Sequence, residues 1–143
     1  MNESAARFIR KILVVDDSEL LHRMYDLILR RYRDEGTVVL HARDGLECLT
    51  MHREHPDIDL ILLDVNMPNL TGIEVMARLR SSNALRAMKV IMVSTEGREA
   101  DVAKAVELGA SGYVTKPFSP TDLHHQIDSI LAERRAMAPM GGA

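Results

Sequence analysis

The sequence has little cysteine, little excess charge of either sign and no long apolar run. Cys48 is the single cysteine among 143 residues, so no intrachain disulfide can form, as is typical of a protein in a reducing compartment. Eighteen basic and twenty-one acidic residues give a formal net charge of −3. This charge argues against a broad electrostatic surface for nucleic acid or anionic membranes.

The longest apolar runs, such as residues 60–63 and 90–93, fall far short of the roughly 20 residues that a membrane-spanning helix requires. Residues 1–7 lack the apolar core of a signal peptide. A chain of 143 residues is most simply one domain, and it is long enough to bury a hydrophobic core. We therefore expect a soluble, cytoplasmic, globular protein.

Two kinds of segment alternate along the chain. Short runs rich in Val, Ile and Leu lack strict polar alternation, which is typical of parallel strands buried on both faces. Between them, apolar residues recur at spacings of three and four, as on one face of a helix. The short runs occupy residues 11–15, 37–41, 60–63, 89–93 and 112–115.

Capping residues mark the boundaries of the predicted helices. Three pairs place a cap and an acidic residue three positions apart: Asp44 with Glu47, Thr71 with Glu74, and Ser119 with Asp122. Pro120 suits the first position of a helix, and Gly36 and Gly109 suit positions just past helix ends. The order βαβαβαβαβα predicts an α/β fold: a doubly wound, open parallel sheet covered by helices on both faces.

Polar residues follow the predicted strands, at the edge where ligands bind in open α/β sheets. Any one of them alone is more simply a loop residue or a helix cap. The set as a whole favours a functional site because its members suit one chemistry. It comprises Asp16, Asp17, Asp64, Ser94, Thr95, Thr115 and Lys116.

Three crowded aspartates need a cation or protons, since two carboxylates about 4 Å apart repel by roughly 4 kcal/mol at an effective dielectric near 20. Mg²⁺ prefers oxygen ligands and keeps several waters, so it suits such a site. One aspartate could then attack a phosphoryl group. Lys116 and Ser94 would supply a cation and a hydroxyl donor to the phosphate oxygens.

Four segments together resemble the response regulator receiver domain, in particular single-domain receivers of the CheY type. They read ILVVDDS at 12–18, LDVNMPNLTG at 63–72, MVS at 92–94 and GASGYVTKPF at 109–118. The resemblance implies a flavodoxin-like (βα)5 fold with strand order 2-1-3-4-5. We expect an N-terminal extension at 1–9, a receiver domain at 10–134, a flexible tail at 135–143 and no output domain.

The resemblance also implies roles for the residues at the acidic edge. Asp64 would accept a phosphoryl group from a histidine kinase or a phosphotransfer protein. Asp17, Asp64 and the backbone carbonyl of Asn66 would hold Mg²⁺, and Asp16 would help through water. Lys116 would contact the phosphate, and the cofactor implied is therefore Mg²⁺.

Further residues match the switch of the family. Ser94 would move toward the phosphate, and Tyr113 would repack the face formed by the fourth helix, the fifth strand and the fifth helix. Pro117 would follow a cis peptide bond. Asn66 and Glu96 occupy the positions that tune loss of the phosphate, and both match the CheY pattern, which predicts a short-lived phosphate.

Thr95 departs from the family, which more often has Ala or Gly there. Its bulk is expected to hinder access to the phosphate or to shift the choice of partner.

The predicted function is that of a stand-alone receiver that signals by phosphorylation-dependent protein binding. It is expected to be a monomer. It is not expected to be an enzyme, apart from removing its own phosphate. Chemotaxis or motility is the favoured pathway, and a phosphorelay shuttle or a kinase-feedback adaptor is the alternative.

Two other classes of protein fit less well. A Mg²⁺-dependent phosphohydrolase of the haloacid dehalogenase type needs a second aspartate where this chain has Asn66, so it would lack a general acid. A flavodoxin-like cofactor carrier needs a phosphate-binding loop after the first strand. Asp16, Asp17 and Glu19 stand there instead and would repel a phosphate.

Overall fold

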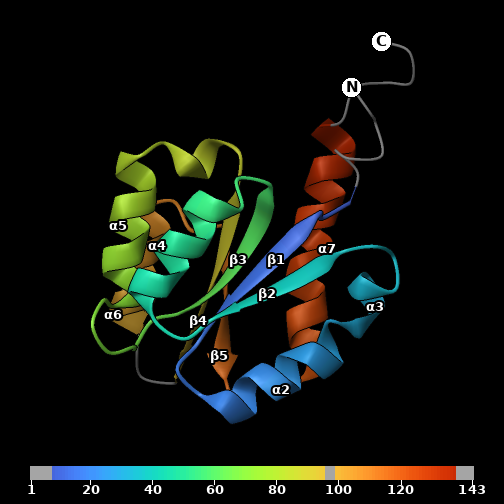
Figure 1. The fold of residues 1–143 in the computed structure, drawn as a ribbon, viewed down its shortest axis with the longest axis horizontal. Coiled ribbons are helices and arrows are strands. Elements are labelled where there is room, and N and C mark those ends of the chain that lie inside the picture. The colour runs from blue at the N-terminus through green and yellow to red at the C-terminus, as the bar shows by residue number, and fades with distance from the viewer. Residues whose placement is uncertain (1–7, 96–98, 138–143) are drawn as a thin grey trace.

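The computed structural model describes residues 8–95 and 99–137, which form a parallel sheet between two layers of helices (Figure 1). The strand order is β2-β1-β3-β4-β5, and all neighbours pair in parallel. The predicted fold class and strand order are confirmed. The strands are β1 (Lys11–Val15), β2 (Val38–Ala42), β3 (Ile58–Asp64), β4 (Lys89–Thr95) and β5 (Gly112–Lys116).

Helices cover both faces of the sheet (Figure 1). One face carries α4 (Gly45–Glu54), α5 (Gly72–Ser81) and α6 (Glu99–Glu107), and a 3-10 turn, η1 (Ala84–Arg86), follows α5. The other face carries α2 (Glu19–Ile28), α3 (Arg30–Arg33) and α7 (Pro120–Met137). None of these helices is both long enough and apolar enough to cross a membrane.

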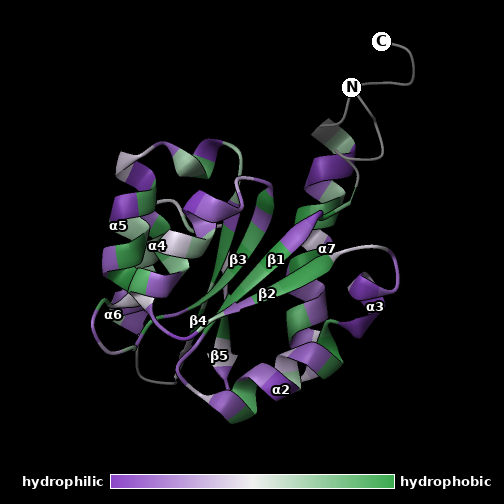
Figure 2. Ribbon diagram, in the orientation of Figure 1, coloured by the Kyte–Doolittle hydropathy of each residue, from purple (hydrophilic) through white to green (hydrophobic). Residues whose placement is uncertain are grey.

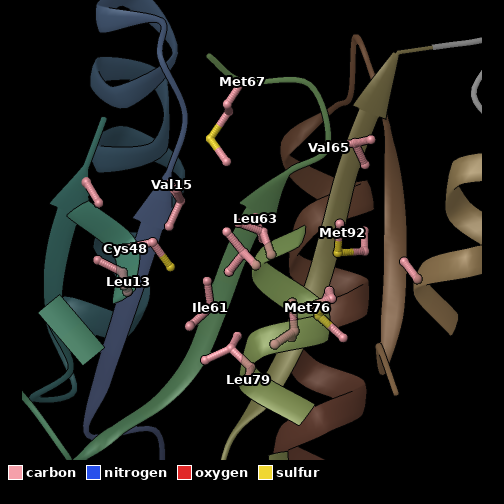
Figure 3. Close-up of a cluster of buried hydrophobic side chains, with 14 of the residues drawn as sticks. Leu13, Val15, Cys48, Ile61, Leu63, Val65, Met67, Met76, Leu79 and Met92 are labelled. Atoms are coloured by element: carbon pink, nitrogen blue, oxygen red, sulfur yellow. The ribbon is translucent and has the colours of Figure 1, made fainter. Parts of the chain in front are cut away.

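Each face of the sheet has its own core, because successive side chains of a strand point to opposite sides. On the face of α4 and α5, Leu13 and Leu63 pack with Cys48 and Met76 (Figure 3). On the other face, alternate residues of the same strands, such as Val14, pack against α2 and α7. Figure 2 shows the consequence: the strands are largely hydrophobic, whereas the helices mix polar and apolar residues.

The predicted caps form. The side chains of Asp44 and Thr71 accept hydrogen bonds from the backbone N–H groups at the starts of α4 and α5. Ser119 and Asp122 exchange two hydrogen bonds at the start of α7, which begins at Pro120 as predicted. Gly36 and Gly109 have φ values of 108° and 113°, in the left-handed region that glycine adopts without strain.

Some boundaries differ from the prediction. The first predicted helix breaks at Leu29 into α2 and α3, because Leu29 leaves the helical conformation with ψ of 0°. Strand β2 lies one residue later than predicted, since the Thr37 backbone N–H donates to the Tyr32 carbonyl at 3.0 Å instead of to a neighbouring strand. Ile9, assigned to the N-terminal extension, is buried in the core. Helix α7 continues to Met137, past the predicted start of the tail.

Candidate functional site

The predicted site residues meet at one edge of the sheet because the strands that carry them are parallel and in register. Asp16 directly follows β1, and Asp64 ends β3. Ser94 pairs with Thr115 across β4 and β5, so Lys116 lies at the same level as Thr95. The sheet therefore gathers side chains that are up to 100 positions apart in the sequence.

Three carboxylates form the centre of this edge. Asp16, Asp17 and Asp64 each place an oxygen within 4.8 Å of the others. Asp16 and Asp64 are buried, whereas Asp17 is exposed. Three oxygen donors with one open side suit a hard cation that keeps water ligands, as Mg²⁺ does. This donor set therefore fits the predicted metal.

Lys116 bridges the two buried carboxylates. Its Nζ lies 2.8 Å from Asp16 Oδ2 and 3.3 Å from Asp64 Oδ1. Burial disfavours the charged ammonium, but the hydrogen bond to Asp16 and the charge of Asp64 raise the pKa of Lys116 overall. Asp16 Oδ2 is therefore held by an ion pair with Lys116, and the water-mediated role of Asp16 at the metal stays a prediction. One partly buried ammonium between two buried carboxylates leaves the site with excess negative charge.

The excess negative charge changes the pKa of the Asp64 carboxyl group. Its burial, together with the negative charge of Asp16, raises the pKa of Asp64 to about 6, although Lys116 and the Asn66 amide act in the opposite direction. The Asn66 N–H donates to Asp64 Oδ1 at 3.4 Å, and the Asn66 side chain is exposed. A bound cation would lower the pKa of Asp64, because it favours the ionised form.

The loop after β1 is held by several hydrogen bonds. Asp16 N–H donates to the Ala42 carbonyl at 3.2 Å, and Asp16 Oδ1 accepts from the Ser18 N–H at 2.8 Å. Ser18 is in turn the N-cap of α2, where its hydroxyl accepts from the Leu21 N–H. The start of the helix and the acidic residues are therefore placed by one connected set of bonds.

The predicted switch residues lie at different depths. Ser94 is buried at the end of β4, and Thr95 beside it is exposed and lines a surface hollow with Lys116. Tyr113 is half exposed on β5 and lines a second hollow with His125 and Gln126 of α7.

Two further expectations concern the loops of this edge. The Lys116–Pro117 peptide bond is cis, as predicted. Glu96, predicted to tune the lifetime of the phosphate, lies outside the described residues.

Sequence reasoning missed one residue at this edge. The His22 side chain is 2% exposed, and its Nε2 lies 2.7 Å from the backbone oxygen of Asp16. Its position three residues before the buried Tyr25 indicates that it faces the core. The sequence could not show that a second histidine, His41 of β2, would meet it there.

Comparisons with known proteins agree with this arrangement. The family model described as "Response regulator receiver domain" matches residues 12–128. The chemotaxis protein CheY homolog of Campylobacter jejuni subsp. jejuni is 34% identical over 121 residues, which cover 85% of this chain and 92% of that protein. The crystallised chemotaxis protein CheY4 of Vibrio cholerae has a TM-score of 0.74 at 31% identity, covering 85% of this chain and 98% of that one.

A longer relative shares the same domain. The alkaline phosphatase synthesis transcriptional regulatory protein PhoP of Bacillus subtilis is 39% identical over 131 residues. That match covers 91% of this chain but only 52% of PhoP. The similarity therefore extends beyond proteins named for chemotaxis.

Proposed function

The chain belongs to the response regulator receiver family, and from this premise we propose that it accepts a phosphoryl group on Asp64 with Mg²⁺ as cofactor. The donor is a histidine kinase or a phosphotransfer protein. The observation that carries the proposal is the meeting of buried Asp64 with Asp16, Asp17 and Lys116 at one sheet edge. The residues proposed as the nucleophile, the cation ligands and the phosphate-binding ammonium thus lie close together.

The transfer forms a bond between a carboxylate oxygen of Asp64 and phosphorus. It breaks the bond between phosphorus and a ring nitrogen of the donor histidine, which leaves with the electron pair. Asp64 must be ionised to attack, which its pKa of about 6 allows at neutral pH. Lys116 already contacts Asp64 and can follow the new phosphate oxygens. Mg²⁺ held by Asp17, Asp64 and the Asn66 backbone carbonyl, with Asp16 helping through water, would neutralise charge on the transferring group.

The phosphate then acts by changing a protein-binding surface, not by reacting with a further substrate. It adds charge and acceptor oxygens at Asp64, so the Ser94 hydroxyl gains a partner and the face of α6, β5 and α7 repacks with Tyr113. A downstream protein that prefers the repacked face responds to the signal. The protein works as a cytoplasmic monomer, and its own chemistry is limited to gain and loss of the phosphate.

The pathway proposed is chemotaxis or motility, which the CheY relatives support. Asn66 and Glu96 are proposed to make the phosphate short-lived. Slow loss of the phosphate that Glu96→Ala leaves unchanged would contradict that part of the proposal.

The test uses acetyl phosphate as donor and intact mass as the readout. The wild-type chain is expected to gain one phosphoryl group in the presence of Mg²⁺. No adduct is expected when EDTA is present. Asp64→Asn is the matched control, because it keeps the volume and removes the nucleophile. An adduct of equal yield on Asp64→Asn, or no adduct on the wild type, would refute the assignment.

A further inference from the structure

A chain of hydrogen-bonded side chains runs from the sheet edge into the acidic loop. Asp26 Oδ1 lies 2.9 Å from His41 Nε2, and His41 Nδ1 lies 2.6 Å from His22 Nδ1. His22 Nε2 lies 2.7 Å from the backbone oxygen of Asp16. His22 and Asp26 are four residues apart on α2, so they lie on one face of that helix, and His41 of β2 joins them.

The acceptor groups at the two ends of the chain determine which histidine nitrogens donate. The Asp16 carbonyl and the Asp26 carboxylate can only accept, so His22 Nε2 and His41 Nε2 both donate. Burial lowers the pKa of His22, with Arg43 and His41 acting in the same direction. The hydrogen bond to the Asp16 carbonyl itself requires a proton on His22 Nε2. The two Nδ1 atoms face each other at 2.6 Å and share one hydrogen bond.

The peptide that His22 holds is the one that joins Asp16 to Asp17. Asp16 has its own bonds to Lys116 and Ser18. Asp17 is exposed, and within residues 8–95 and 99–137 no hydrogen bond to its carboxylate is found. The position of that carboxylate near Asp64 therefore depends on the backbone that carries it, and His22 bonds the oxygen of the preceding peptide at 2.7 Å.

We propose that His22 is a positioning residue for the cation site, which holds the Asp16–Asp17 peptide so that the Asp17 carboxylate faces Asp64. His41 and Asp26 orient the His22 ring for this task. The inference rests on the proposed function, because it assigns His22 a role in binding the Mg²⁺ that phosphorylation requires.

The test measures Mg²⁺ affinity by isothermal titration calorimetry on the full chain, with the melting temperature of each variant. His22→Leu removes the donor to Asp16 and is expected to weaken Mg²⁺ binding by about 10-fold or more. His22→Gln keeps an amide N–H near the position of Nε2 and is expected to restore most of the affinity. Such rescue would not follow if His22 only filled space.

His124→Leu is the matched control. His124 Nε2 makes the same kind of bond, at 2.7 Å, to the Ile28 carbonyl at the far end of α2. This variant is expected to lower the melting temperature and to leave Mg²⁺ affinity unchanged. If His22→Leu fails to fold, His41→Leu takes its place, since it removes the support of the His22 ring at a partly exposed position and should also weaken binding.

The outcomes separate the two proposals. If the wild type binds Mg²⁺ and the folded His22→Leu or His41→Leu variant binds it equally tightly, the role of His22 is refuted while the proposed function stands. If the wild type itself does not bind Mg²⁺, the proposed function fails and the role of His22 fails with it.

Discussion

Asp59 and Asp64 lie at opposite ends of strand β3, and their surroundings give them opposite effects on stability. Asp59 is 1% exposed and accepts from Arg10 through the backbone N–H, Nε and Nη2, at 2.8, 3.1 and 2.7 Å. Asp64 is 4% exposed and shares Lys116 with a second buried carboxylate. The charge of Asp59 is balanced by Arg10, whereas the charge of ionised Asp64 is not balanced, because Lys116 is shared with Asp16.

Asp64→Asn should stabilise the protein when Mg²⁺ is absent. The folded-state pKa of Asp64, about 6, lies above its value of about 3.9 in an unfolded chain. The stabilising contribution of this group is therefore present below about pH 4 and lost as pH rises through about 6. The variant should raise the free energy of unfolding by up to about 3 kcal/mol at neutral pH, and less as the pH falls toward 4.

The measurement is urea unfolding at several pH values in EDTA, with Asp59→Asn as the contrast. That variant removes the partner of Arg10 and should lower the free energy of unfolding by about 3 kcal/mol. A loss of stability in Asp64→Asn at neutral pH would show that Lys116 compensates both carboxylates, against the present account.

At the residue scale, the sequence alone predicts the acidic edge but not its supports. Asp16, Asp64 and Lys116 follow from the positions at which apolar runs end. The meeting of His22 with His41 depends on how α2 lies against β2, which no periodicity specifies. The bonds of Asp59 to Arg10 likewise join residues 49 positions apart.

At the scale of elements, the start of α5 is fitted against the end of β3. The Gly72 N–H donates to the Val65 carbonyl at 2.9 Å. A Cβ atom on Gly72 would lie 2.4 Å from the backbone oxygen of Asp64 and 2.8 Å from Val65 Cα. Backbone atoms of a central strand cannot move aside easily, so this contact requires glycine.

Gly72→Ala should displace the backbone around Asp64. We expect it to lower the free energy of unfolding by about 1–3 kcal/mol, as overpacking does, and to slow phosphorylation by acetyl phosphate. Gly112→Ala is the matched control, because its Cβ would meet only the flexible side chain of Gln126. Equal stability and equal phosphorylation rates in the two variants would contradict this account of the α5 start.

Boundaries of elements were predictable where capping chemistry marks them, as at Asp44, Thr71 and Pro120. They were less predictable where apolar spacing continues through a break. The spacing runs on to Tyr32, yet the helix is interrupted at Leu29, which is buried. The tail was predicted to begin at residue 135, whereas α7 ends at Met137, because composition alone does not mark the last turn of a helix.

At the scale of the whole molecule, alternating apolar and helical segments predict a doubly wound sheet, but they do not order the strands. The order followed from the resemblance of four motifs to one family. The structure explains why this order matters: it places β1 and β3 side by side, so Asp16 and Asp64 meet. The negative charge at this edge opposes folding, and a bound cation would offset it.

Binding of Mg²⁺ should therefore stabilise the whole domain. A ligand at 100 times its Kd that binds only the folded state adds about 2.7 kcal/mol. Thermal unfolding of the wild type should shift upward with Mg²⁺ concentration, while Asp17→Asn, which removes one charge of the site, should respond less. An equal response of both proteins would place the stabilising cation elsewhere.

The most direct test of the central claim identifies the residue that carries the phosphate. After treatment with acetyl phosphate and Mg²⁺, borohydride reduction converts an aspartyl phosphate to homoserine, which peptide mass spectrometry locates. The account predicts homoserine at position 64 and none when EDTA is present. Homoserine at another aspartate, or Mg²⁺-independent labelling of position 64, would contradict it.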